Sequence, residues 1–172
     1  MEKATKTKKS IIVAVSGGFD PIHVGHVRMF HEAKLLGDEL VVILNNDNWL
    51  INKKGFFFMS EEERKEVLEG FRDVDGVVLT HHKLGDADRS VVQELRELRP
   101  DIFANGGDRK PDWDPVPEVA LCEELGIEMV YNVGHGGKVQ SSSWLLNKYM
   151  GEANCICGSG KKYKDCHGKT RE

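Results

Sequence analysis

The stretch Ile11-Ile-Val-Ala-Val-Ser-Gly-Gly-Phe-Asp-Pro-Ile-His-Val-Gly-His26 decides the fold. Its first five residues are apolar and mostly β-branched, which predicts a short buried parallel strand, and Ser-Gly-Gly at 16–18 predicts a turn. Apolar residues then recur at helical spacing over residues 24–36, and Gly37 stands where a helix would end. A strand, a glycine turn and a helix in direct succession are typical of the first unit of a parallel α/β sheet.

The rest of the chain repeats this alternation of strand and helix. Capping-box patterns at Ser60 with Glu63 and at Ser90 with Gln93 mark two further helix starts. We expect strands at 40–45, 76–80, 101–105 and 127–132, and helices at 60–68, 90–98, 116–125 and 141–150. The alternation predicts an α/β fold, a Rossmann-like doubly wound five-stranded parallel sheet, with its ligand crevice at the carboxyl ends of the strands.

Length and composition limit the domain organisation and the class of protein. The 172 residues suffice for one domain and a small appendage, and 40% hydrophobic residues argue against disorder. The longest apolar runs are far shorter than the roughly 20 residues that span a bilayer, and the N-terminus lacks a signal-peptide pattern. We therefore expect a cytoplasmic protein without a membrane span, with a basic N-terminal tail at 1–9, an α/β domain at 10–150 and a cysteine-rich tail at 151–172.

The charges are distributed unevenly along the chain. The formal net charge is −4, and the body between the two tails carries 15 basic against 24 acidic residues. Charge alone therefore does not predict a nucleic-acid-binding surface on the body.

The turn after the first strand has the features of a phosphate-binding site. Gly17 and Gly18 let a ligand approach the backbone, and the helix N-terminus that follows attracts anions. His23 and His26, three positions apart at the helix start, share one face and can donate to the same oxyanion of a transferred phosphoryl group. For either histidine alone, a cap or a packed side chain is the alternative. The turn matches neither the dinucleotide fingerprint G-x-G-x-x-G nor the P-loop.

Gly-Gly-Phe-Asp-Pro followed by the H-x-G-H of His23 and His26 resembles the cytidylyltransferase-like nucleotidyltransferases of the HIGH type, over residues 10–150. The resemblance implies transfer of a nucleoside monophosphate from an NTP, ATP or CTP, to a phosphomonoester, with release of pyrophosphate and with Mg²⁺ on the NTP. It also implies that the two histidines are catalytic. The nucleotide-binding residues that it implies in this turn are Gly17, Gly18, Phe19, Asp20 and Gly25.

The same resemblance assigns two basic residues downstream. Lys54 follows the second strand and corresponds to a catalytic lysine that meets the triphosphate or the acceptor phosphate, whereas we interpret Lys53 as a solvated lysine. Arg64 corresponds to an arginine that contacts the acceptor phosphate. A surface partner at i,i+4 spacing is an equal alternative for Arg64.

Two further segments match nucleotide-binding signatures of the family. Gly107 and Asp108 lie in a Gly-Gly-Asp turn after the fourth strand, for which a plain turn is the alternative. Ser141, Ser142 and Ser143 open the last helix, where hydroxyls and amides bind the β and γ phosphates of the NTP. An N-cap is the alternative for any one of these serines.

The last 22 residues contain a second motif. Cys155, Cys157, Cys166 and His167 form C-x-C-x8-C-H, a donor set that tetrahedral Zn²⁺ prefers, and His167 fits a metal site but not a disulfide or redox site. The spacing resembles the SEC-C zinc motif, which implies a non-catalytic interaction element with a possible protein partner. Because so short a tail cannot bury a core unaided, we expect metal to supply its folding energy and the tail to be independent of the active site.

Departures from the family pattern bear on the substrate. Lys138 stands where members that use CTP carry Arg-Thr, and Phe57-Phe58-Met59 replaces an Arg-Pro. The spacing looks closest to the adenylyltransferase half of heptose-phosphate enzymes, so a sugar or alditol phosphate is the expected acceptor. The apolar run 56–59 suggests a homodimer interface as one arrangement. A non-catalytic nucleotide-binding scaffold that docks a partner through its zinc tail is the alternative function.

Overall fold

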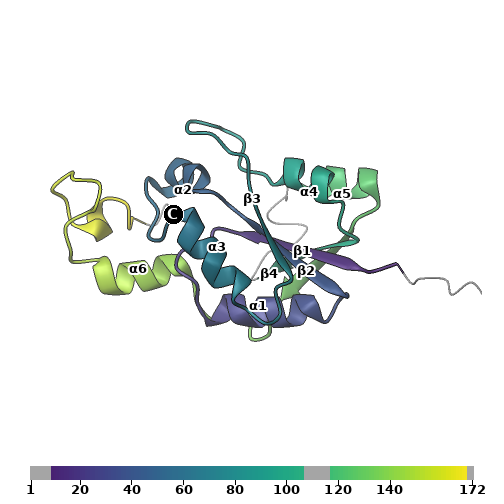
Figure 1. Ribbon diagram of the computed structural model, residues 1–172. Coiled ribbons are helices and arrows are strands. Elements are labelled where there is room, and N and C mark those ends of the chain that lie inside the picture. Colours follow the sequence, from purple (N-terminus) through teal and green to yellow (C-terminus); the bar gives the residue numbers. More distant parts are fainter. Residues whose placement is uncertain (1–8, 107–116, 170–172) are drawn as a thin grey trace, which may run out of the picture.

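The computed structural model describes residues 9–106 and 117–169, and its centre is one sheet of five parallel strands (Figure 1). The sheet order is β3-β2-β1-β4-β5, so the chain moves outward from β1 to β3 and then returns to the other side of β1 with β4. This reversal beside β1 creates the switch point at which open α/β sheets bind ligands. The predicted fold is confirmed. The strands are β1 (Ile12–Gly17), β2 (Glu39–Leu44), β3 (Gly76–Leu79), β4 (Ile102–Gly106) and β5 (Glu128–Val133).

The helices follow the predicted alternation with two differences. They are α1 (Val24–Lys34), α2 (Asp47–Lys54), α3 (Glu61–Glu69), α4 (Val92–Leu98), α5 (Val119–Leu125), α6 (Ser142–Met150) and the short 3-10 helix η1 (Tyr163–Asp165). Helix α2 was not predicted, because only Trp49 and Leu50 of its residues are buried and it therefore lacks an apolar stripe. The predicted cap of α4 is wrong: Ser90 Oγ donates to Asp88, and α4 begins after Val91 without a side-chain cap.

Alternating strand residues build a core on each face of the sheet. Val13 and Val15 of β1 pack in a cluster with α1 and α3, whereas Ala14 between them joins α4 and α5 on the opposite face. Fully burying one such aliphatic side chain contributes about 1.5–3 kcal/mol. The two clusters hold β1 from both sides, so the turn that follows it starts from a rigid support.

A third apolar cluster joins the tail to the body. Phe56, Leu146, Cys155 and Tyr163 are buried together, and Figure 1 shows the tail, in yellow, beside α6 at the end of the molecule where α2 lies. The tail therefore packs on the body, and its expected independence of the active site stays a prediction. Phe56 is also buried within the chain rather than left open for a homodimer, whereas Phe57 and Phe58 are exposed. Across residues 9–106 and 117–169, no helix has both the length and the apolar character to cross a membrane.

Candidate active site

A cleft of about 410 Å³ opens at the carboxyl ends of β1 and β4, the switch point of the sheet. It is lined by the turn after β1, the N-terminus of α1, the end of α2 and the start of α6. The sequence-predicted residues that line it together are Gly17, Gly18, Phe19, Asp20, His23, Gly25, His26, Lys54, Ser141, Ser142 and Ser143. Gly107 and Asp108 lie outside the described residues.

The turn after β1 is packed so closely that a side chain at either of its glycines would displace a neighbouring side chain. A Cβ on Gly17 would lie 2.9 Å from the Phe19 ring, and one on Gly18 would lie 2.8 Å from Leu50. Phe19 itself adopts a positive φ of 49° and is almost completely buried, with its ring edge against His26 at 4.9 Å between centroids. The ring of Phe19 therefore packs against the imidazole of His26 at the edge of the cleft.

The two histidines form a stacked pair at the start of α1. Their rings lie 3.7 Å apart at an angle of 19°. Each Nδ1 accepts a backbone N–H, His23 from Gly25 and His26 from His23. A neutral ring that accepts at Nδ1 carries its proton on Nε2. Both imidazoles can therefore donate from Nε2 to one oxyanion.

The protonation states agree with this donor arrangement. Burial lowers the pKa of His23, and burial together with the neighbouring charge on His23 lowers the pKa of His26 to about 3. Both rings are thus neutral near pH 7. A neutral donor stabilises developing charge on a phosphoryl oxygen without first repelling its stacked neighbour.

Lys54 lies in the cleft at the end of α2. Its Nζ donates to the carboxylate of Asp20 at 2.6 Å and to the Asp20 carbonyl at 3.2 Å. The Asp20 carboxylate also accepts from the amides of Phe58 and Met59, at 2.8 Å each, and its side chain is 1% exposed. Asp20 therefore joins three segments of the site, and its carboxylate is almost completely shielded from solvent.

Arg64 of α3 is buried beneath the site. Its guanidinium is 0% exposed and donates to the carbonyls of Gly18, Asn45 and Met59 and to the carboxylate of Asp47. This burial contradicts the surface-partner alternative. The contact with an acceptor phosphate stays a prediction, and in this structure the guanidinium joins the ends of β1 and β2 through the carbonyls of Gly18 and Asn45.

The serines at the start of α6 have separate contacts. Ser141 is the N-cap, and its Oγ accepts from the amide of Trp144. Ser142 Oγ donates to the carbonyl of Pro21 at 2.8 Å, which joins the start of α6 to the turn that carries His23. Ser143 lines the cleft. The N-termini of α1 and α6 thus converge on one cavity, an arrangement that favours an anion.

Three buried polar side chains that the sequence analysis did not single out also line the cleft: Asn45, Asn105 and Glu118. Each is 4–5% exposed, and among the described residues Asn45 Oδ1, Asn105 Nδ2 and Glu118 Oε2 are buried without a hydrogen-bond partner. An unpaired buried group costs about 1–3 kcal/mol, which a bound ligand can recover. Asn45 and Asn105 could have been predicted as cleft residues, because each is a polar residue at the carboxyl end of an apolar strand. No local pattern marks Glu118.

The Cys/His residues of the tail converge as the motif predicts. One donor atom from each of Cys155, Cys157, Cys166 and His167 lies within 4.8 Å of the others. Cys157 Sγ is 3.7 Å from Cys166 Sγ, close to the edge of about 3.8 Å that a tetrahedron with Zn–S bonds of about 2.3 Å requires. Desolvation opposes ionisation of Cys155, but hydrogen bonds from the Cys157 backbone and the His167 ring lower its pKa to about 6. The cluster fits a metal ion.

Comparisons with known proteins show the family of the chain. The family model described as cytidylyltransferase-like matches residues 14–134, and the SEC-C motif matches residues 153–169. An FAD synthase from Thermococcus sibiricus is 37% identical over 72% of this chain and 82% of its own length. The FAD synthase from Thermoplasma volcanium is 32% identical over 81% of this chain and 94% of its own length.

The fold is also similar to that of a solved structure. The crystal structure of the lipopolysaccharide core biosynthesis protein from Thermoplasma volcanium is 29% identical, covers 74% of this chain and 99% of its own, and has a TM-score of 0.61. Because the curated relatives are FAD synthases, the predicted likeness to heptose-phosphate enzymes is only approximate. The chain is a nucleotidyltransferase that belongs to the cytidylyltransferase-like family and carries a C-terminal SEC-C motif.

Proposed function

We propose that this enzyme transfers the adenylyl group of ATP to FMN, forming FAD and releasing pyrophosphate. The curated relatives are FAD synthases, which supports this reaction and gives no support to a free sugar or alditol phosphate as acceptor. FMN is itself a phosphomonoester, carried on a ribityl chain. The proposed reaction is of the class predicted from the sequence. Its acceptor is FMN rather than a sugar or alditol phosphate.

The observation that carries the proposal is the division of the cleft between the two faces of the sheet. His26 and Met29 of α1 line it on the face where α1 packs, next to the start of α6. Asn45 and Asn105 lie two residues beyond Ile43 and Phe103, which belong to the cluster of α4 and α5. Because side chains of a strand alternate, both asparagines face the α4 side. We assign the first half of the cleft to ATP and the second half to the acceptor.

The acceptor half offers complementary groups to a flavin. Among the residues that the structure describes, its unpaired buried atoms are a donor, Asn105 Nδ2, and two acceptors, Asn45 Oδ1 and Glu118 Oε2. The dione edge of the isoalloxazine ring carries an N–H between two carbonyls, so it both donates to and accepts from such a set. Trp49 and Leu50 supply apolar walls for a flat ring.

The chemical step then needs positioning and charge stabilisation. An oxygen of the FMN phosphate attacks the α-phosphorus in line, the bond from that phosphorus to the bridging oxygen breaks, and pyrophosphate leaves with the electron pair. The Nε2–H groups of His23 and His26 donate to the charged oxygens, and the N-termini of α1 and α6 bind the triphosphate. Mg²⁺ enters with the triphosphate as part of the substrate. Among the described residues that line the cleft, the carboxylates are Asp20 and Glu118.

The test is a substrate screen. The purified protein is incubated with ATP or CTP and with FMN, glycerol phosphate or a sugar phosphate, and pyrophosphate and FAD are quantified by coupled assay and chromatography. We expect FAD from ATP with FMN. Turnover only with another pair would overturn the acceptor assignment, and no turnover with any pair would favour the scaffold alternative.

The second part of the proposal is that the tail binds one Zn²⁺ per chain through Cys155, Cys157, Cys166 and His167. Thiolate donors with one imidazole are a ligand set that zinc prefers. When bound, zinc supplies folding energy to the tail and no chemistry at the cleft. Metal analysis of the purified chain and of a Cys157→Ser variant checks the stoichiometry; equal zinc content in both would contradict the assignment.

A further inference from the structure

The tail and the active-site turn meet at Phe56. We propose that Phe56 is a positioning residue through which the metal-binding tail holds Lys54 and the Asp20 turn in their observed arrangement. This role of Phe56 does not depend on which phosphomonoester is the acceptor.

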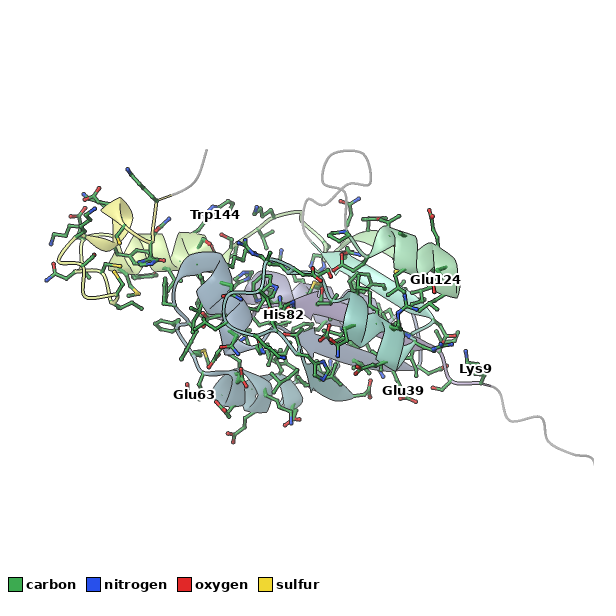
Figure 2. The ribbon with its side chains drawn as sticks, turned by 90° about the horizontal axis from the view of Figure 1, so that it is seen from above. Lys9, Glu39, Glu63, His82, Glu124 and Trp144 are labelled. Carbon is green, nitrogen blue, oxygen red and sulfur yellow. The ribbon has the colours of Figure 1, made fainter. Side chains whose placement is uncertain are left out.

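The first step is the contact between the tail and Phe56. Phe56 is 7% exposed, and its ring packs edge-on against Tyr163 at 5.7 Å and against the metal-ligand residue His167 at 5.8 Å. Leu146 of α6 and Cys155 complete the same buried cluster. In Figure 2, the labelled Trp144 marks α6, which lies between the tail and the sheet. The surface that covers Phe56 thus consists largely of residues at or beside the metal ligands.

The second step is the contact between His167 and the end of α2. His167 turns Nδ1 toward Cys155 at 3.0 Å and Cys166 at 3.4 Å. Its Nε2 lies against Gly55, so close that a Cβ at position 55 would overlap the ring. Gly55 has a φ of 83° and ends the helix whose last residue is Lys54. A metal ligand therefore touches the backbone next to a residue of the cleft.

Residues 54–59 also contact the turn that carries His23, through Asp20. The Nζ of Lys54 lies 5.1 Å from the centre of the Phe56 ring while it donates to Asp20. The amides of Phe58 and Met59 donate to the same buried carboxylate. The segment 54–59 is thus held on one side by Asp20 and on the other by the tail, and Asp20 stands three residues before His23.

The physical consequence follows from the size of the tail. A tail of this length buries too little surface to fold alone, so removing the metal removes the energy that keeps Tyr163 and His167 against Phe56. Segment 54–59 then loses one of its two supports. Its local opening becomes more frequent, although the sheet, which has its own cores, is unaffected.

Hydrogen exchange on the full chain tests the coupling without any substrate. After zinc removal by a chelator, we expect the amides of Phe58 and Met59 to exchange at least ~10-fold faster, whereas amides of β1 and β2 keep their rates. Faster exchange confined to residues 153–169 would overturn the inference, because the tail would then open without affecting the turn.

Variants separate Phe56 from a general loss of the tail. In zinc-loaded protein, Phe56→Ala should reproduce the faster exchange at Phe58 and Met59 and lower kcat by at least ~10-fold with zinc still bound, because one misplaced charged group has that effect on positioning. Phe56→Leu, which keeps an apolar contact, should restore most of kcat. Phe57→Ala is the matched control, since the Phe57 side chain is 37% exposed and should change neither exchange nor kcat.

If Phe56→Ala is unstable, hydrogen exchange after chelation still tests the coupling, because that experiment uses the unmodified chain. Unchanged kcat and exchange in a zinc-loaded Phe56→Ala protein would also overturn the inference. Failure of the proposed FMN acceptor would appear in the substrate screen alone, so the two failures are distinguishable.

Discussion

Replacing Arg64 with Met tests whether this arginine positions the site or contacts the acceptor. The change keeps much of the apolar length of the side chain and removes four hydrogen bonds, three to carbonyls and one to Asp47. Removing one partner of a buried ion pair costs about 3–5 kcal/mol. Asp47 is 20% exposed and keeps some hydration, so the lower end of this range applies. We expect the free energy of unfolding to fall by about 3 kcal/mol.

Urea-induced unfolding followed by circular dichroism measures this change. A loss of about 3 kcal/mol raises the unfolded fraction more than about 100-fold. Arg72→Met is the matched control, because the Arg72 side chain is 89% exposed and its loss should cost under about 0.5 kcal/mol. If Arg64→Met lost less than about 1 kcal/mol of stability while the KM for the acceptor rose, the positioning argument would be refuted and the acceptor contact supported.

Removing one donor with His23→Ala or His26→Ala should lower kcat at least ~10²-fold while the protein stays folded, as single-turnover kinetics and circular dichroism can establish. Because the folded pKa of His26 is about 3 and its ordinary value is 6.5, the unfolded state binds more protons between these values, so stability should fall as pH drops below about 6.5. Urea midpoints from pH 7 to pH 4 should therefore decline less steeply for His26→Gln than for the unmodified chain, and equal slopes would contradict the burial of a neutral ring. Ser142→Ala should raise the KM for ATP, because the bond from Ser142 Oγ to Pro21 joins the two helix N-termini; an unchanged KM would count against that junction. Glu118→Gln should raise the KM for FMN and leave that for ATP unchanged, since its unpaired oxygen lies in the proposed acceptor half; equal effects on both substrates would remove this assignment.

The features predicted correctly are those with a local signal. The apolar, β-branched run at residues 11–15 and its repeats along the chain predict the parallel sheet, because a strand buried on both faces needs such a run. The spacing of His23 and His26 at a helix start places both rings on one face whatever surrounds them. Helix α2 escaped prediction because its start at Asn46 and its end at Gly55 enclose no apolar stripe.

The sequence by itself therefore determined the fold class, the pairing of His23 and His26 after β1 and the Cys/His cluster of the tail, because each depends on contacts within a few residues. The tertiary structure alone decided that Arg64 is buried beneath the site, that Asn45, Asn105 and Glu118 converge on one cleft, and that the tail packs on Phe56. These arrangements join segments far apart in the chain. The burial of a side chain and its partners depend on which segments the folded sheet brings together. The local sequence pattern does not predict these contacts between distant segments.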